Sequence, residues 1–207
     1  MTNGHLQIRI YGVDGTARTL VQDSPELINR TLQDLNPMTL FAQDEIVISD
    51  GDATVTFLPP TLARIDLMSD CLSVWDYPFA LGALVELTEP EFLEFLRQPR
   101  PRPPANSANG TPVCLKLEML HGQPVFLWMQ VIAGLPPARW QKIYSQLKEP
   151  RLIFDLRAGG IGVLNLANLV RASIHPDPAE LAGAAGVVPP VVERPRLRLA
   201  GRVGCQP

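Results

Sequence analysis

Cysteine and histidine are scarce in this chain, and their positions argue against disulfide and metal chemistry. The 207 residues include three cysteines and three histidines, which are Cys71, Cys114, Cys205, His5, His121 and His175. A disulfide framework or a zinc site needs ligands at defined short spacings, and none of these six residues has such a neighbour. We therefore expect reduced thiols, no bound metal and no cofactor.

Long apolar runs are also missing. No stretch approaches the roughly 18 residues that a membrane-spanning helix needs. The first twelve residues, MTNGHLQIRIYG, have neither the basic start nor the apolar segment of a secretory signal. These features predict no membrane partner and a cytoplasmic protein of bacterial type.

Sequence motifs of catalysis are absent as well. The chain contains no GxGxxG, no GxxxxGK[ST] and no GxSxG, which are the signatures of dinucleotide binding, nucleotide phosphate binding and a serine nucleophile. The glycines of AGGIGVLN, residues 158–165, are followed by a predicted strand, whereas a phosphate loop requires a helix start. We therefore predict no catalytic residue.

The composition describes a chain that can bury a large core. Hydrophobic residues make up 46% and charged residues 19%, with a net charge of −3. The mean hydropathy of +0.07 is high for a monomer, so a protein partner or a second copy is expected to cover some apolar surface. The small negative charge gives the whole protein no attraction for nucleic acid.

Two distant segments of the chain resemble each other. LQIRIYGVDGTARTLV at 6–21 and VCLKLEMLHGQPVFLW at 113–128 both alternate apolar and polar residues around a central glycine, Gly15 or Gly122. Alternation interrupted by a glycine turn is typical of a β-hairpin. The segments LARIDLMSD and LVRASIHPD, at 62–70 and 169–177, match in the same way.

Between these matching ends, each half is expected to hold a helix and further strands. Ser24 and Pro25 begin a helical pattern in one half, and LPPARWQKIYSQLKEP at 135–150 gives the pattern in the other. Proline ends a helix, so Pro37 and Pro150 are matched. Aromatic strands are then expected around Phe41 and Phe154, each followed by a glycine turn.

The sequence therefore predicts an α+β fold made of two tandem ββαβββ pseudo-repeats, at 5–70 and 112–177, with mainly antiparallel small sheets or barrels. The domain organisation follows: a first lobe at 1–70, a connecting strand–helix segment and proline-rich linker at 71–111, a second lobe at 112–177, and a Pro/Arg-rich tail at 178–207. The alternative is that two unrelated α+β segments resemble each other by chance.

The connecting segment has its own pattern. YPFALGALVEL at 77–87 predicts a strand, and TEPEFLEFLRQP at 88–99 predicts a short helix capped by Thr88. Residues 99–111 read as an extended linker. The predicted irregular tail contains LRLAGRV at 197–203, which alternates basic and apolar residues and can add as an edge strand to a sheet.

Seven residues are candidates for partner binding. Arg64, which forms a polar pair with Asp66, and Arg171 occupy matching positions and could form an anion or carboxylate clamp. We favour a structural role, in which each arginine pairs with its own Asp70 or Asp177 or closes the edge of its unit. The aromatic cluster at 75–79 marks a binding hot spot or a core between the lobes. The tail arginines lie beside or within the segment that can add as an edge strand. The candidates are Arg64, Trp75, Tyr77, Phe79, Arg171, Arg196 and Arg198.

Three functions are consistent with the sequence. The leading prediction is a non-enzymatic protein-binding or assembly protein that acts through an inter-lobe or apolar surface and a docking tail, with another protein or a second copy as partner. The alternative is a nucleic-acid-binding or regulatory module. It would use Arg97, Arg100, Arg102, Arg194, Arg196, Arg198 and Arg202. A second alternative is an enzyme with a site in an inter-lobe cleft.

Overall fold

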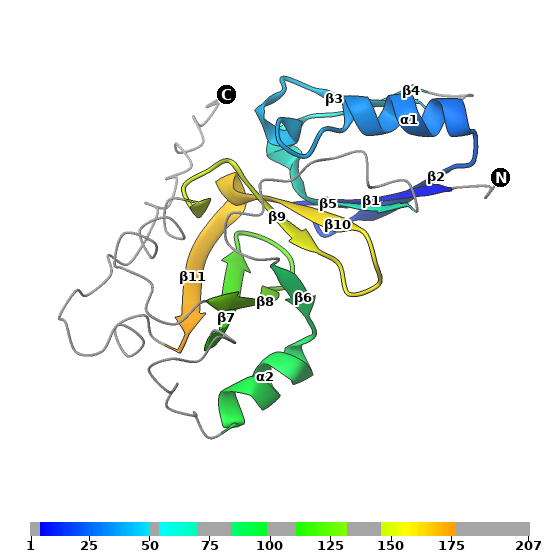
Figure 1. The fold of residues 1–207 in the computed structure, drawn as a ribbon. Helices are drawn as coiled ribbons and strands as arrows, with labels where there is room; N and C mark the ends of the chain where they lie inside the picture. The colour runs from blue at the N-terminus through cyan, green and yellow to red at the C-terminus, as the bar shows by residue number, and fades with distance from the viewer. Residues whose placement is uncertain (1–4, 50–53, 70–83, 99–110, 132–145, 177–207) are drawn as a thin grey trace, which may run out of the picture.

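The protein is a mixed α+β structure with one large, mostly antiparallel sheet. The computed structural model describes residues 5–49, 54–69, 84–98, 111–131 and 146–176, and two α-helices lie in these ranges (Figure 1). The elements are β1 (Leu6–Gly12), β2 (Ala17–Gln22), α1 (Pro25–Asp34), η1 (Leu40–Ala42), β3 (Ile46–Ser49), β4 (Thr54–Phe57), η2 (Pro59–Thr61), β5 (Leu62–Ser69), β6 (Val85–Leu87), α2 (Glu89–Arg97), β7 (Thr111–Met119), β8 (Val125–Val131), β9 (Arg151–Asp155), β10 (Ile161–Asn165), η4 (Leu166–Asn168) and β11 (Leu169–His175).

Nine of the strands form one continuous sheet in the order β11-β7-β8-β6-β9-β10-β5-β1-β2, and β3 pairs only with β4. The prediction of separate small sheets is therefore wrong. The two halves of the chain are joined because β10 pairs with β5, and because β6 pairs with both β8 and β9. The pairing of β6 with β9 is parallel, whereas the other strand pairs are antiparallel.

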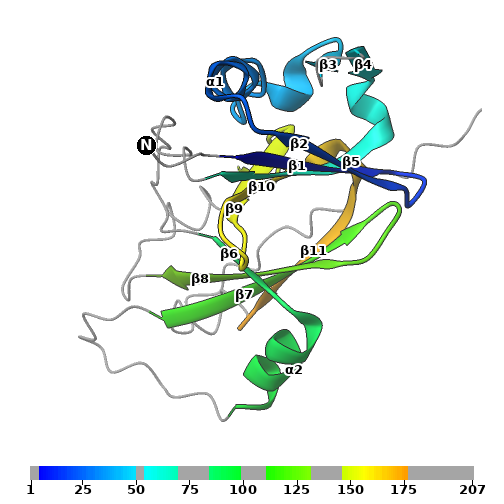
Figure 2. The same cartoon turned by 90° about the vertical axis from the view of Figure 1, so that its right-hand side faces the viewer.

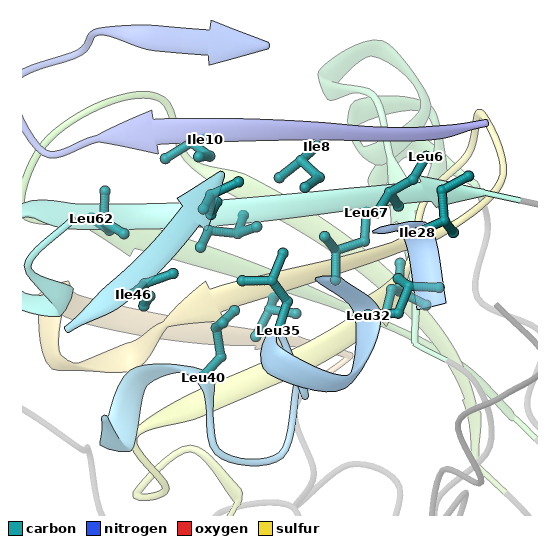
Figure 3. Packing of buried hydrophobic residues seen from close by; sticks show 14 residues of the cluster. Leu6, Ile8, Ile10, Ile28, Leu32, Leu35, Leu40, Ile46, Leu62 and Leu67 are labelled. Atoms are coloured by element: carbon teal, nitrogen blue, oxygen red, sulfur yellow. The ribbon is translucent and has the colours of Figure 1, made fainter. Parts of the chain in front are cut away.

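The first hydrophobic cluster lies between α1, the β3–β4 hairpin and one face of β1, β5 and β10. Ser24 precedes the helix, and Ile28, Leu32 and Leu35 recur at the spacing that places them on one side of α1. Figure 3 shows these side chains directed toward those of β1 and β5. The alternation in LQIRIYG is explained because every second residue of β1 enters this cluster.

A second cluster lies on the opposite face of β9 and β10, between these strands and the β7–β8 part of the same sheet. Figure 2 shows these two parts of the sheet as separate layers. All five residues of β10 are buried, because Ile161 and Val163 face the first cluster while Leu164 faces the second. A strand buried on both faces reads as a continuous apolar run. Strand β10 is therefore shared by both cores.

Helix α2 packs on the outer face of the β7–β8 hairpin. Phe92 of α2 contacts Phe126, with ring centroids 4.7 Å apart, and forms a third cluster with Cys114. The predicted cap is confirmed, because the Thr88 hydroxyl accepts from the Glu91 N–H while the Glu91 carboxylate accepts from the Thr88 N–H. Within the described ranges, neither helix is long and apolar enough to cross a lipid bilayer.

Two groups of three strands have matching registers. We call β2-β1-β5 the first module and β8-β7-β11 the second module. In the hairpins, Leu6 faces Gln22 and Val113 faces Met129, so that adding 107 to positions 6 and 22 gives 113 and 129. The turn glycines Gly15 and Gly122 differ by the same 107 positions, and both have positive φ, at 82° and 87°.

The last strand of each module follows the same rule. Tyr11 faces Arg64 in the first module, and Glu118 faces Arg171 in the second, again 107 positions later. Both ladders are interrupted directly after this pair, so Ala63 and Val170 are the unpaired residues of two equivalent irregularities. A short 3₁₀ turn, η2 or η4, precedes each last strand at the same 107-position offset.

Two details of the predicted repeat are wrong. Phe41 lies in η1 and not in a strand, whereas Phe154 lies in β9, so the two are not equivalent. His175, which the sequence pattern was expected to place after the last strand and before a proline, is the last residue of β11. The second predicted helix falls mostly on residues outside the described ranges, so the complete ββαβββ repeat and the four domain boundaries stay predictions at this point.

A substitution at Gly162 tests how tightly the shared strand is packed. A Cβ at Gly162 of β10 would overlap the ring of Phe154, its partner on β9. Gly162→Ala should lower the free energy of unfolding by about 1–3 kcal/mol, a typical loss for overpacking. Urea denaturation measures it. If the overlap is the cause, the double variant Gly162→Ala/Phe154→Leu should lose less free energy of unfolding than the sum of the two single losses. Additive losses would contradict the packing.

Candidate functional site

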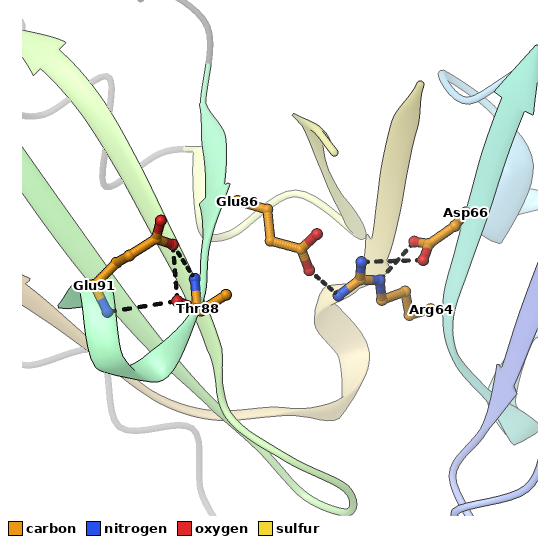
Figure 4. A network of polar contacts seen from close by, with 5 residues as sticks. All are labelled: Arg64, Asp66, Glu86, Thr88 and Glu91. Carbon is orange, nitrogen blue, oxygen red and sulfur yellow. Dashed lines mark hydrogen bonds and ion pairs between the residues drawn. The ribbon is translucent and has the colours of Figure 1, made fainter. Parts of the chain in front are cut away.

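One group of converging polar side chains lies where the two halves of the chain meet. Arg64 and Asp66 are two residues apart on β5 and therefore lie on the same face of the strand. Arg64 Nε donates to Asp66 Oδ1 at 2.5 Å, and Arg64 Nη2 donates to Asp66 Oδ2 at 3.0 Å. Arg64 Nη1 lies 2.6 Å from Glu86 Oε1 of β6, and this contact links β5 to β6 (Figure 4).

Burial shapes the electrostatics of this group. Removal from water raises the pKa of Asp66, and the hydrogen bonds from Arg64 offset part of that rise. Burial opposes the charge of Arg64, but the hydrogen bonds and charges of Asp66 and Glu86 outweigh it, and the pKa of Arg64 is raised. The guanidinium carbon also lies 4.9 Å from the ring centre of Phe154 and 5.4 Å from that of Tyr11. These contacts hold Arg64 in place inside the protein.

The matching arginine of the second module has a different environment. Arg171 is exposed on β11 and faces Glu118 of β7. It contributes to lowering the pKa of Glu118, although the hydrogen bond from Lys116 is the main cause. The structure therefore does not bring Arg64 and Arg171 together. Asp70 and Asp177, the other predicted ion-pair residues, lie outside the described ranges.

A second polar contact at this joint was not found from the sequence. Asn165, at the end of β10, is 3% exposed. Its Nδ2 donates to the carbonyl oxygens of Pro59 and Leu62, both at 2.9 Å, and its Oδ1 accepts from the Ala167 N–H at 3.1 Å. An asparagine at the end of a strand has no spacing that reveals such distant partners, which explains why the sequence did not indicate it.

The outer sides of the two equivalent hairpin strands, β8 and β2, differ from each other. On its outer side, β8 is covered by β6, because Val85 faces Trp128 and Leu87 faces Phe126. The equivalent strand of the first module, β2, is the last strand of the sheet and pairs only with β1 among the described residues. Its side chains Ala17, Thr19 and Val21 are exposed.

The faces beside these two edges also differ. Cys114, Phe126 and Trp128 carry α2 on the second module, and burial raises the pKa of the Cys114 thiol to about 12. Their counterparts 107 positions earlier, in the first module, are Gln7, Thr19 and Val21. Of these, Thr19 and Val21 are exposed. The first module thus has neither a covering strand nor a helix at this place within the described part of the chain.

The remaining candidate residues carry little structural information. Trp75, Tyr77, Phe79, Arg196 and Arg198 lie outside the described ranges. Of the arginines considered for nucleic-acid binding, Arg97 lies in the described part, in the last turn of α2. Within the described residues, no group of three histidine, cysteine, aspartate or glutamate side chains is placed to hold a metal ion.

The two matching arginines provide a direct test of the joint. Arg64→Ala leaves the buried Asp66 carboxylate without its main partner, and breaking a buried ion pair in this way costs about 3–5 kcal/mol. Arg171→Ala removes an exposed side chain and should leave the free energy of unfolding nearly unchanged. Chemical denaturation of both variants measures the difference. Equal losses would show that the Arg64 contacts do not stabilise the fold.

No family model, curated protein or solved structure matches this chain. Its function therefore has to be inferred from its own contacts, burial and strand pairing.

Proposed function

We propose that this protein is a non-enzymatic protein-binding or assembly protein, built from two copies of one structural unit at 5–70 and 112–177. Duplication is supported by the constant offset of 107 positions, which relates the hairpin registers, the turn glycines, the ladder interruptions and the 3₁₀ turns of the two modules. Unrelated strands have no reason to share all four features.

The observation that carries the proposed function is the different treatment of two equivalent edges. The outer edge of β8 is covered by β6, whereas β2 has no strand beside its outer edge within the described ranges. An uncovered edge presents unpaired N–H and C=O groups, which is the surface that strand-adding partners recognise. We therefore place protein binding at the outer edge of β2.

The other strand edges are less suited to this role. β11, at the opposite end of the sheet, has an irregular ladder at Val170, and such irregularities discourage strand addition. β3 and β4 have four residues each, and short strands make poor templates. β2 has six residues, a regular ladder with β1, and neither proline nor lysine.

The contacts at the joint support a binding role better than an enzymatic one. Arg64, Asp66 and Glu86 form a polar cluster in which Arg64 contacts both carboxylates. A catalytic site instead needs polar groups that are free to contact a substrate. In this proposal the joint holds the two units rigidly, and the exposed edge of the first unit contacts the partner.

Site-specific photocrosslinking tests the proposed function. A photoreactive benzoylphenylalanine that replaces Val21, which is 56% exposed on β2, should form adducts with protein in an extract of the native cells. The matched control replaces Val47 on β3, which is 44% exposed, and should yield few adducts. Mass spectrometry identifies the products. Absence of protein adducts at position 21, or equal yields at both positions, would refute binding at the β2 edge.

A further inference from the structure

We infer that the β2 edge binds the β2 edge of a second copy of this chain, which produces a twofold symmetric dimer with one sheet continuous through both molecules. This inference rests on the proposed function of the β2 edge and names its partner. The argument uses the direction of the backbone groups, the self-complementarity of β2 and its charge.

The turn before β2 sets the direction of its backbone groups. Gly12 N–H donates to the Thr16 carbonyl at 2.9 Å, and Gly15 N–H donates to the Gly12 carbonyl at 3.1 Å. Hydrogen-bonded and non-hydrogen-bonded pairs alternate along an antiparallel ladder. The residues that turn their N–H and C=O groups toward β1 are therefore 18, 20 and 22. Those of Ala17, Thr19 and Val21 point to the open edge.

These three residues suit pairing with themselves. When two copies of β2 run antiparallel with Thr19 facing the partner's Thr19, Ala17 of each copy faces the partner's Val21. All three outward residues of each copy are then used, which gives roughly six backbone hydrogen bonds between the chains, two for each pair. Threonine opposite threonine is a favourable pair across an antiparallel ladder, and the valine–alanine pairs bring no like charges together.

Charge selects the same arrangement. Arg18 is the one charged residue of β2, and in the Thr19-centred pairing it faces the partner's Leu20. A pairing centred on Arg18 would instead place two arginines opposite each other, which is unfavourable. Because the net charge of each chain is only −3, long-range repulsion between two copies is small.

The second module shows this kind of contact inside the chain. β6 lies antiparallel to β8 and covers Phe126 to Trp128, which are the counterparts of Thr19 to Val21. A twofold partner strand would lie along β2 in the same relative direction and at the same residues. The high mean hydropathy of the chain, +0.07, agrees with apolar surface being covered by a second copy.

Light scattering coupled to size-exclusion chromatography tests the inference on the full chain over a wide range of concentration. We expect a mass that rises toward twice the 22.7 kDa of one chain. Val21→Lys puts a charged side chain opposite the partner's Ala17, and lysine on an edge strand disfavours strand addition. Thr19→Pro removes the central outward N–H without removing a bond to β1. Each should raise the dimer dissociation constant at least about tenfold, equivalent to about 1.4 kcal/mol.

The matched control is Val47→Lys, which adds the same charge at an exposed valine of β3 and should leave the dissociation constant unchanged. Circular dichroism checks that each variant folds. If Thr19→Pro does not fold, the dissociation constant of the Val21→Lys variant decides the test. A chain that stays monomeric, a dimer unaffected by the folded β2 variants, or one weakened equally by Val47→Lys would overturn the inference. A monomer whose position 21 still crosslinks to another protein would refute self-pairing while keeping the proposed function.

Discussion

The pairing of β10 with β5 is the contact on which the rest of this structure depends. β10 belongs to the second half of the chain, yet it completes the sheet of the first half and contributes side chains to both large cores. Each core would lose one of its walls without this strand. The Arg64–Glu86 ion pair and the hydrogen bonds of Asn165 lie beside the same contact and bind the two halves further. The joint is therefore part of both cores.

This arrangement uses two similar modules in different ways. In the first module, the outer edge of β5 is occupied by β10, and in the second module, the outer edge of β8 is occupied by β6. The side chains explain why β8 and β2 differ. Phe126 and Trp128 of β8 are large and apolar and pack under α2, whereas Thr19 and Val21 of β2 tolerate exposure as single side chains. One edge is thus paired within the chain, while the equivalent edge, that of β2, has no neighbouring strand among the described residues.

Local features of this structure were predictable from sequence, and long-range ones were not. The strand alternation around Gly15 and Gly122 gave both hairpins, and the pattern at Thr88 gave α2, because hydrophobic periodicity and capping act over a few residues. Arg64 and Asp66 stood out as a polar pair in the sequence, but Asp70 was the expected ion-pair partner, whereas Arg64 contacts Asp66 and Glu86. Glu86 and Asn165 were missed because their partners are set by sheet order, which depends on contacts between distant segments. Phe41 was placed in a strand because an apolar run followed it, although the strand begins only at Ile46.

Residue-resolved hydrogen exchange in the full chain tests most directly whether β2 offers an open edge that a partner strand completes. In dilute solution, the amides of Ala17, Thr19 and Val21 should exchange rapidly, while those of residues 18, 20 and 22, and those of Phe126 and Trp128, exchange slowly. When a second strand binds, the three outward amides should become protected together. Slow exchange of all six β2 amides in a dilute monomer would mean that the chain covers this edge itself, and would contradict the account.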